Sequence, residues 1–141
     1  MPRASRYILP GQTVHITQRC HNRSFLLKFA KDRSRYVDRR RERLEGHAID
    51  LFNYCITSNH VHLLLRDRVA GEVSNIPAFM NSLAGDFAQS YNLRKKRSGS
   101  YWGDRYHASM IDDREYLFRC LRYIDMNRMR AGVVAHPSEW D

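Results

Sequence analysis

The amino-acid sequence predicts an α+β fold in which helices pack against one antiparallel sheet. Short segments rich in β-branched residues alternate with longer segments of helical periodicity, in the order strand, helix, strand, strand, helix, strand, helix. The first six elements follow the split βαβ, ferredoxin-like order. Such a sheet carries helices on one face and leaves the other free for binding or catalysis.

The first strand is predicted at 11–20, where polar and apolar residues alternate after a glycine. A helix is predicted at 31–46, with Gly46 at its C-terminus. Its six arginines and thin apolar face, mainly Tyr36, Val37 and Leu44, indicate a solvated, basic helix.

Two consecutive strands are predicted at 48–58 and 60–68, joined by a turn near Ser58 and Asn59. Large apolar residues at helical spacing then predict an amphipathic helix over 74–94.

The rest of the chain completes the pattern. Residues 93–100 form a basic loop, and the aromatic-rich segment 101–111 is expected to be extended. A last helix is predicted at 112–132, with aspartate at its start, arginines late and Gly132 at its end. This helix lies beyond the six ferredoxin-like elements.

The bulk properties are those of a globular protein with a polyanionic partner. With 141 residues, the chain is expected to form a single domain over 1–141. Its net charge of +9 favours nucleic acid as the partner, although a well-solvated basic surface is the alternative. Three separated cysteines and the absence of a signal peptide or membrane span predict a cytoplasmic protein without a membrane partner.

His60 and His62 are the first candidates for chemistry. Side chains two residues apart on a strand point the same way, so both imidazoles project from one face and can chelate a divalent cation. Val61, Leu63 and Leu65 then pack on the opposite face. The spacing alone is weak evidence, because two hydrogen-bonded structural histidines would give the same pattern.

The last helix offers further candidates. Tyr123 and Asn127 are one turn apart at the edge of its buried face, on the same side as Tyr116 and Cys120. An amide oxygen suits Mg²⁺ or Mn²⁺ as a third ligand, and a phenol beside such a cation can attack a phosphate. The alternative is an aromatic-rich helix that only packs on the sheet.

Basic and aromatic residues near the predicted site suggest contacts with single-stranded nucleic acid. Arginine and lysine track a phosphate backbone, while aromatic rings stack on exposed bases. The candidates for DNA binding are Arg94, Lys95, Lys96, Arg97, Trp102, Arg105, Tyr106, Arg119 and Arg122.

Four ordered segments resemble the single-tyrosine HUH transposases, specifically the REP-associated tyrosine transposases. They are "GQTVHITQRCHNR", "SNHVHLLL", "YWGDRYHASMID" and "YLFRCLRYIDMNRMRAGVV", and the resemblance covers residues 5 to 140. It implies a ferredoxin-like nuclease that acts on single-stranded DNA, often a hairpin, with Mg²⁺ or Mn²⁺ as cofactor.

The resemblance also implies a role for each candidate. By position, His60 and His62 match the metal ligands, Asn127 the residue that completes the metal site, and Tyr123 the nucleophile. The implied reaction is DNA cleavage and strand transfer through a 5′-phosphotyrosine, as in DNA transposition and recombination. The family includes dimers and monomers, so a homodimer is left open.

Three departures from the family pattern bear on the site. Thr57-Ser58 stands where members commonly have Met-Pro, which we expect to change the turn but not the ligands. Arg128 replaces a proline, so the helix can continue past Asn127. The chain ends at "PSEWD", where relatives often continue, which indicates a truncated chain or a short member.

Three alternative functions are distinguishable. A non-catalytic module that binds DNA or RNA hairpins would have the same topology, but the aromatic-rich strands typical of RNA-recognition domains are absent. A replication- or conjugation-type HUH nickase would share the metal site. A zinc hydrolase lacks a third ligand at convincing spacing.

Overall fold

The computed structural model describes residues 8–68 and 71–130, except for the side chains of the last three. The elements are β1 (Thr13–Arg19), the short 3₁₀ helix η1 (His21–Arg23), α1 (Ala30–His47), β2 (Ile49–Ile56), β3 (His60–Asp67), α2 (Ile76–Lys95), β4 (His107–Ile111) and α3 (Arg114–Arg130). None of the helices in this part of the chain is both long and apolar enough to span a bilayer.

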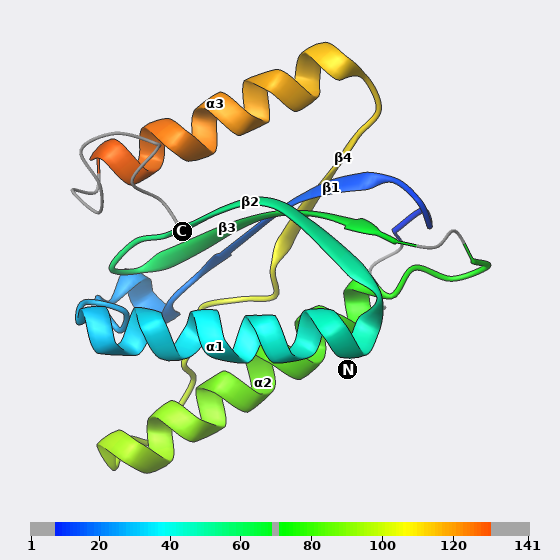
Figure 1. Cartoon of the computed structure of the whole chain (residues 1–141). Coiled ribbons are helices and arrows are strands. Elements are labelled where there is room, and N and C mark those ends of the chain that lie inside the picture. The colour runs from blue at the N-terminus through cyan, green and yellow to red at the C-terminus, as the bar shows by residue number, and fades with distance from the viewer. Residues whose placement is uncertain (1–7, 69–70, 131–141) are drawn as a thin grey trace.

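The four strands form one antiparallel sheet in the order β2-β3-β1-β4. Helices α1 and α2 cover one face of the sheet, and α3 lies across the other (Figure 1). This confirms the predicted α+β, ferredoxin-like fold with an additional C-terminal helix. We call the α3 side of the sheet the histidine face, because His60 and His62 project from it together with Leu64, which packs under α3.

The opposite face holds the main hydrophobic core. Val61, Leu63 and Leu65 are fully buried there, as the alternation along the strand predicted. Val14 and Ile16 of the neighbouring strand β1 continue this layer, and the large apolar residues of α2 pack onto it. Burial of this face therefore determines which side chains β1 and β3 present on the other side.

Helix α1 is more buried than its composition indicated. Tyr36 is fully buried, and only 3% of the surface of Arg40 is exposed. The guanidinium of Arg40 lies 3.9 Å from the centre of the Tyr54 ring. The prediction of a solvated basic helix is therefore wrong for this side of α1. The sequence pattern failed because arginine can bury its long stem and place its charge over an aromatic ring.

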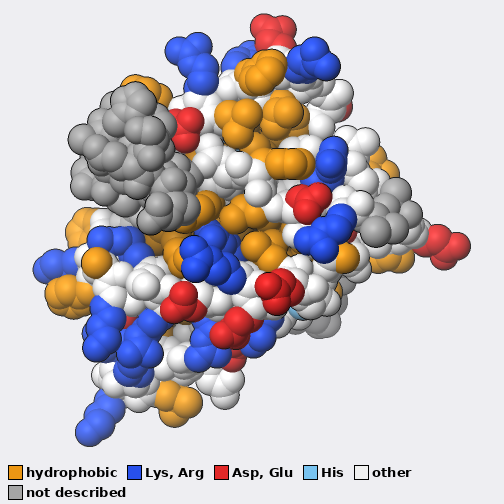
Figure 2. All heavy atoms as spheres, viewed as in Figure 1, with side chains coloured by type: hydrophobic (Ala, Val, Ile, Leu, Met, Phe, Trp, Pro, Cys, Tyr) orange, Lys and Arg blue, Asp and Glu red, His pale blue; other side chains and the backbone are white. Residues whose placement is uncertain are grey.

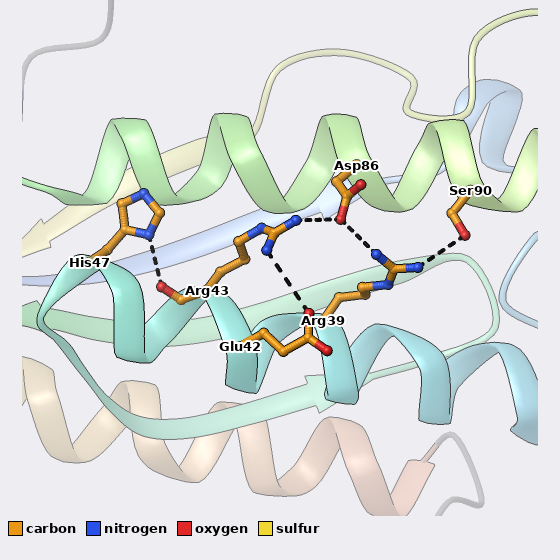
Figure 3. A network of polar contacts seen from close by, with 6 residues as sticks. All are labelled: Arg39, Glu42, Arg43, His47, Asp86 and Ser90. Atoms are coloured by element: carbon orange, nitrogen blue, oxygen red, sulfur yellow. Dashed lines mark hydrogen bonds and ion pairs between the residues drawn. The ribbon is translucent and has the colours of Figure 1, made fainter.

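Ion pairs connect α1 to α2 along their exposed sides (Figure 3). The carboxylate of Asp86 on α2 accepts hydrogen bonds from Arg39 at 2.9 Å and from Arg43 at 2.6 Å. Arg39 also reaches Ser90 at 3.4 Å. Lys and Arg side chains over these two helices are interspersed with Asp and Glu (Figure 2), so part of the positive charge is compensated within the protein.

Several predicted boundaries need correction. Helix α1 continues through Gly46 to His47, and Ala48 takes the left-handed conformation at its end, with φ of 52°. The carbonyl of Ala48 accepts the Arg68 N–H at 2.8 Å, which holds this conformation at the start of the sheet. The extended segment predicted at 101–111 is a strand only from His107 onward.

Helix α3 is attached to the sheet by a small second core. Ile124 is fully buried and Cys120 is 6% exposed, and both pack against Leu64 and Cys55 of the sheet. At the start of the helix, the carboxylate of Asp113 accepts the Tyr116 N–H at 2.7 Å, which confirms an aspartate cap. The helix continues past Asn127 to Arg130.

We expect Ile124→Ala to lower the free energy of unfolding by about 2–4 kcal/mol, because it removes a fully buried branched side chain between α3 and the sheet. Urea denaturation would measure this change. Phe118→Ala, at a position 57% exposed on the same helix, is the matched control and should change stability by less than about 0.5 kcal/mol. Equal effects would contradict the proposed attachment of α3.

Candidate active site

Strand β3 places the two predicted metal ligands side by side on the histidine face. The ring centroids of His60 and His62 are 4.9 Å apart, with the ring planes nearly perpendicular. His62 is buried, with 3% of its surface exposed, whereas His60 is half-buried. Neighbouring strand β1 sets Thr17 opposite His62 and Arg19 opposite His60.

Two side chains of the β2–β3 turn hold His60. Its Nδ1 lies 2.8 Å from Asn59 Oδ1 and 2.8 Å from Thr57 Oγ1. The Asn59 amide nitrogen donates to the Arg23 carbonyl at 3.3 Å, so its oxygen faces the imidazole. Because an amide oxygen only accepts, His60 Nδ1 carries a proton and Nε2 holds the lone pair.

Thr57, one of the departures from the family pattern, contacts His60. From the sequence we expected the Thr57-Ser58 departure to change the turn and not the ligands. Both candidate ligands are in place, and the Thr57 hydroxyl touches the His60 ring directly, while the Thr57 N–H donates to the His60 carbonyl at 2.9 Å. The side chain at this position therefore helps to orient a candidate ligand.

A third histidine, His15 of β1, lies against His62. The His15 Nε2 and His62 Nδ1 atoms are 3.1 Å apart, and Thr17 Oγ1 is 3.3 Å from the same Nδ1. The two rings are within 20° of parallel, with centroids 5.3 Å apart. At this separation the rings meet edge to edge through their nitrogens.

Burial keeps these imidazoles neutral. It lowers the pKa of His62 to about 3, and neighbouring His60, His15 and Arg19 add to this effect. Burial also lowers the pKa of His60 and of His15, with smaller contributions from Arg19 and from His107 respectively. A neutral imidazole is the form that binds a metal.

The two candidate ligands fit a divalent cation. His62 Nε2 is buried and has no hydrogen-bond partner among the described residues, and the second imidazole lies beside it. Adjacent neutral imidazole nitrogens are suitable ligands for divalent metals. In the part of the chain that the structure describes, no three His, Cys, Asp or Glu side chains form a metal site by themselves, so a further ligand from this part would be of another type.

Helix α3 sets Tyr123 against His62 and His15. The centroid of its ring is 5.5 Å from that of His62 and 6.3 Å from that of His15, in edge contacts, and 52% of the residue is exposed. Asn127 is one turn farther along, and its amide nitrogen donates to the Tyr123 carbonyl at 3.2 Å. Metal coordination by the Asn127 oxygen stays a prediction.

Two cavities are lined by residues of β1, the strand next to the histidine pair. One, of about 390 Å³, lies under α3 and is lined by His15, Tyr116, Arg119, Cys120 and Tyr123. The other, of about 260 Å³, lies between the end of β1, with the segment that follows it, and the loop before β4. Its lining includes Thr17, Arg19, Arg23, Arg105 and His107. Both therefore combine a wall of the candidate site with arginine side chains.

The predicted DNA-binding residues fall into two groups. Arg105 and Arg119 line these cavities, and Arg122 is exposed on α3. Arg105 lies in the loop before β4, not on the strand as expected. The other members, Arg94, Lys95, Lys96, Arg97, Trp102 and Tyr106, lie at the end of α2, beyond it, or against the main core.

Several residues of the second group form ion pairs and hydrogen bonds within the protein. Arg94 forms an ion pair with the buried carboxylate of Asp32 at 2.8 Å, and Lys95 lies 3.7 Å from the same group. Arg97 donates to Asn92 Oδ1 and to the Ser100 carbonyl, both at 2.9 Å. These contacts fasten α2 and the loop after it to the rest of the protein.

The aromatic members of that group also serve packing. The indole N–H of Trp102 donates to the Ala84 carbonyl at 3.0 Å, and its ring packs against Tyr36 and Phe87. Half-buried Tyr106 packs against the same core.

Sequence reasoning missed His15, Thr17, Thr57 and Asn59 as parts of the site. His15 stands in an alternating strand, and only the pairing of β1 with β3 brings it to His62. The alternation of β1 shows that His15 and Thr17 share a face. It does not give the register that aligns them with particular residues of β3.

We expect the stability of the metal-free protein to fall below about pH 6.5, partly because of His62. Its pKa is lowered on folding, so between about pH 6.5 and about 3 only the unfolded chain takes up this proton. Stability is therefore complete above that range and falls as the pH is lowered, by up to about 1.4 kcal/mol per unit for one such group. Urea denaturation across this range should show a shallower slope for His62→Gln; an unchanged slope would contradict the burial of His62.

Comparison with known proteins identifies the family of the chain. A family model described as "Transposase IS200 like" matches residues 9–127. Among solved structures, that of a REP-associated tyrosine transposase bound to a REP hairpin has a TM-score of 0.77 and 17% identity, covering 99% of this chain and 80% of that one. A candidate transposase from Deinococcus radiodurans R1 has a TM-score of 0.58 and 19% identity, covering 88% and 95%.

A search of curated proteins found no match. The solved structures are similar in fold, and the family assignment comes from the family model. Its matched range contains both histidines, Tyr123 and Asn127. The chain therefore belongs to the IS200-like transposase family.

Proposed function

We propose that this protein cleaves single-stranded DNA and transfers the strand through a covalent 5′-phosphotyrosine at Tyr123, with the help of a divalent cation. The observation that supports this most directly is the position of Tyr123, whose ring lies 5.5 Å from that of His62 on the histidine face. The nucleophile and the candidate metal ligands come from different elements, α3 and β3, and converge on one site.

The proposed substrate is DNA that folds into a hairpin. The structure matching at a TM-score of 0.77 is a REP-associated tyrosine transposase bound to a REP hairpin, and on this basis we place the protein in the REP-associated branch. A net charge of +9 suits a polyanionic substrate. The three cysteines are free thiols, which suits a reducing cytoplasm.

The reaction is an exchange of phosphate esters. The Tyr123 hydroxyl loses its proton, and its oxygen forms a bond to the scissile phosphorus as the bond from phosphorus to the 3′ oxygen breaks. The departing 3′ oxygen takes up a proton and becomes a free hydroxyl. Because one phosphate ester replaces another, no nucleotide cofactor is needed, and the reverse attack by a 3′ hydroxyl rejoins strands.

Mg²⁺ or Mn²⁺ is the proposed cofactor. The residues that would hold it are His60 and His62, through their Nε2 atoms, and Asn127, through its amide oxygen. When bound, a divalent cation stabilises the negative charge that develops on the phosphate. Asn59 and Thr57 orient the His60 ring toward this role by binding its Nδ1.

The histidine face is the proposed path of the DNA. Arg119 lines the cavity beside Tyr123, and Arg105 lines the second cavity, together with Thr17 and Arg19 of β1. Arg122 on α3 extends the basic surface. Cationic groups in the two cavities would position the phosphates that flank the scissile one.

We expect Tyr123→Phe to abolish the covalent product while leaving DNA binding nearly unchanged, because only the hydroxyl is lost. The protein would be mixed with labelled hairpins from the DNA flanking its own gene, with Mn²⁺, and resolved on a denaturing gel. The wild type should give a labelled band at the mass of protein plus oligonucleotide. Tyr116→Phe, on the same cavity, is the matched control and should retain it.

Two further lanes complete this test. EDTA and His62→Ala should each remove the covalent band, since EDTA removes the cation and the substitution removes one of its proposed ligands. Normal cleavage by Tyr123→Phe would show that another residue is the nucleophile, with Tyr116 the next candidate. Retarded DNA on a native gel without any covalent band would favour the alternative function, a non-catalytic hairpin-binding module.

Salt dependence should identify the DNA-binding face. The double variant Arg105→Ala/Arg119→Ala should weaken hairpin binding and reduce the slope of log affinity against log salt by about one for each phosphate that the protein no longer neutralises. Fluorescence anisotropy at several salt concentrations measures both. Lys95→Ala/Lys96→Ala removes the same charge at the end of α2, and a larger effect there would place the DNA on the other side of the sheet.

A further inference from the structure

We propose that His15 is a positioning residue for the metal site. Its Nε2 accepts a hydrogen bond from the Nδ1–H of His62, which fixes that imidazole in the tautomer whose Nε2 lone pair is available to a divalent cation. This inference rests on the metal site of the proposed function, but it concerns a residue of β1 that lies outside the proposed ligand set.

The contact itself has the geometry of a hydrogen bond between two rings. His15 Nε2 and His62 Nδ1 are 3.1 Å apart, and the ring planes differ by 20°. With the rings nearly coplanar, the lone pair of one nitrogen can point along the N–H bond of the other. One of the two nitrogens must carry the proton and the other must accept it.

Burial decides which nitrogen is the donor. If His15 were the donor, His62 would carry its own proton on Nε2, which is buried and has no partner among the described residues. A buried N–H without an acceptor is rare and costly. With the proton on Nδ1, His62 donates to His15, and its Nε2 presents only a lone pair.

The second ligand shows the same arrangement. His60 Nδ1 donates to Asn59 Oδ1 at 2.8 Å, and this contact fixes the proton on Nδ1 because the amide oxygen cannot donate. Both imidazoles then present Nε2 as the unprotonated atom. Partners of this kind fix the tautomer and orientation of metal-binding histidines in many proteins.

His15 is not itself the third ligand in this arrangement. In the described part of the chain, no three His, Cys, Asp or Glu side chains are grouped for metal binding. The His15 nitrogen that reaches His62 is already engaged with Nδ1, the ring atom that does not bind the metal. His15 therefore acts on the cation only through His62.

The tautomer can be measured without metal or DNA. Long-range ¹H–¹⁵N NMR spectra of the metal-free protein should show His62 protonated at Nδ1, and His15→Leu should give a mixture of tautomers or a shift to Nε2–H. Protonation of His62 at Nε2 in the wild type would overturn the inference. An unchanged Nδ1–H tautomer of His62 in His15→Leu would also overturn it, because Thr17 alone would then fix the tautomer.

Calorimetric titration with Mn²⁺ alone measures the consequence. His15→Leu should weaken binding by about 10-fold or more, and His15→Gln, whose amide oxygen can accept the same hydrogen bond, should restore most of it. His47→Leu is the matched control, since this histidine ends α1 on the other face of the sheet, and it should bind like the wild type.

The outcomes separate the two hypotheses. Wild-type protein that binds no Mn²⁺ would overturn the proposed metal site and, with it, the role of His15 in metal binding. Wild-type protein that binds Mn²⁺ with the same affinity as His15→Leu would overturn the inference and leave the metal site in place. Thermal unfolding of each variant shows whether it is folded before it is titrated.

Discussion

The antiparallel pairing of β1 with β3 is the constraint on which the site depends. It sets Thr17 opposite His62 and Arg19 opposite His60, and it brings His15 diagonally against the His62 ring. Because side chains alternate along a strand, a shift of one residue would turn His15 and Thr17 toward the main core. Val14 and Ile16, both fully buried on the other side, oppose such a shift.

The second requirement is a helix across the face that a ferredoxin-like sheet otherwise leaves open. Ile124 and Cys120 attach α3 through a small core separate from the main one. This attachment brings Tyr123 to the histidines while 52% of the residue stays exposed. The proposed role of Tyr123 as nucleophile needs both properties, since the residue would have to meet the cation and also be reached by the DNA strand.

Much of the fold was predictable from the sequence because its signals are local. Alternation in β3 predicted that Val61, Leu63 and Leu65 would be buried and that His60 and His62 would share the other face, and the structure confirms both. The burial of Arg40 was not predictable in this way, because it depends on the ring of Tyr54 in another element. Local patterns show which residues are amphipathic and do not show what they meet.

The same limit applies to the site. His60, His62 and Tyr123 were found from spacing and from the resemblance to a known family, and the structure brings them together. His15 depends on strand register, and the Thr57 contact depends on the geometry of a turn. The predicted DNA-binding residues differ most from their positions in the structure. The sequence grouped Arg94 with Arg119 as DNA-binding residues. In the structure, Arg94 forms an ion pair with Asp32 on the other side of the sheet, while Arg119 lines the cavity beside Tyr123.

The central claim is that one cation binds between His60 and His62 under Tyr123. The most direct measurement is anomalous X-ray diffraction from crystals of the Tyr123→Phe variant, which cannot cleave, grown with Mn²⁺ and a DNA hairpin. We expect one strong peak bound to the Nε2 atoms of His60 and His62, with a DNA phosphate beside it. A manganese ion bound elsewhere, or a phosphate that lies away from position 123, would contradict the account.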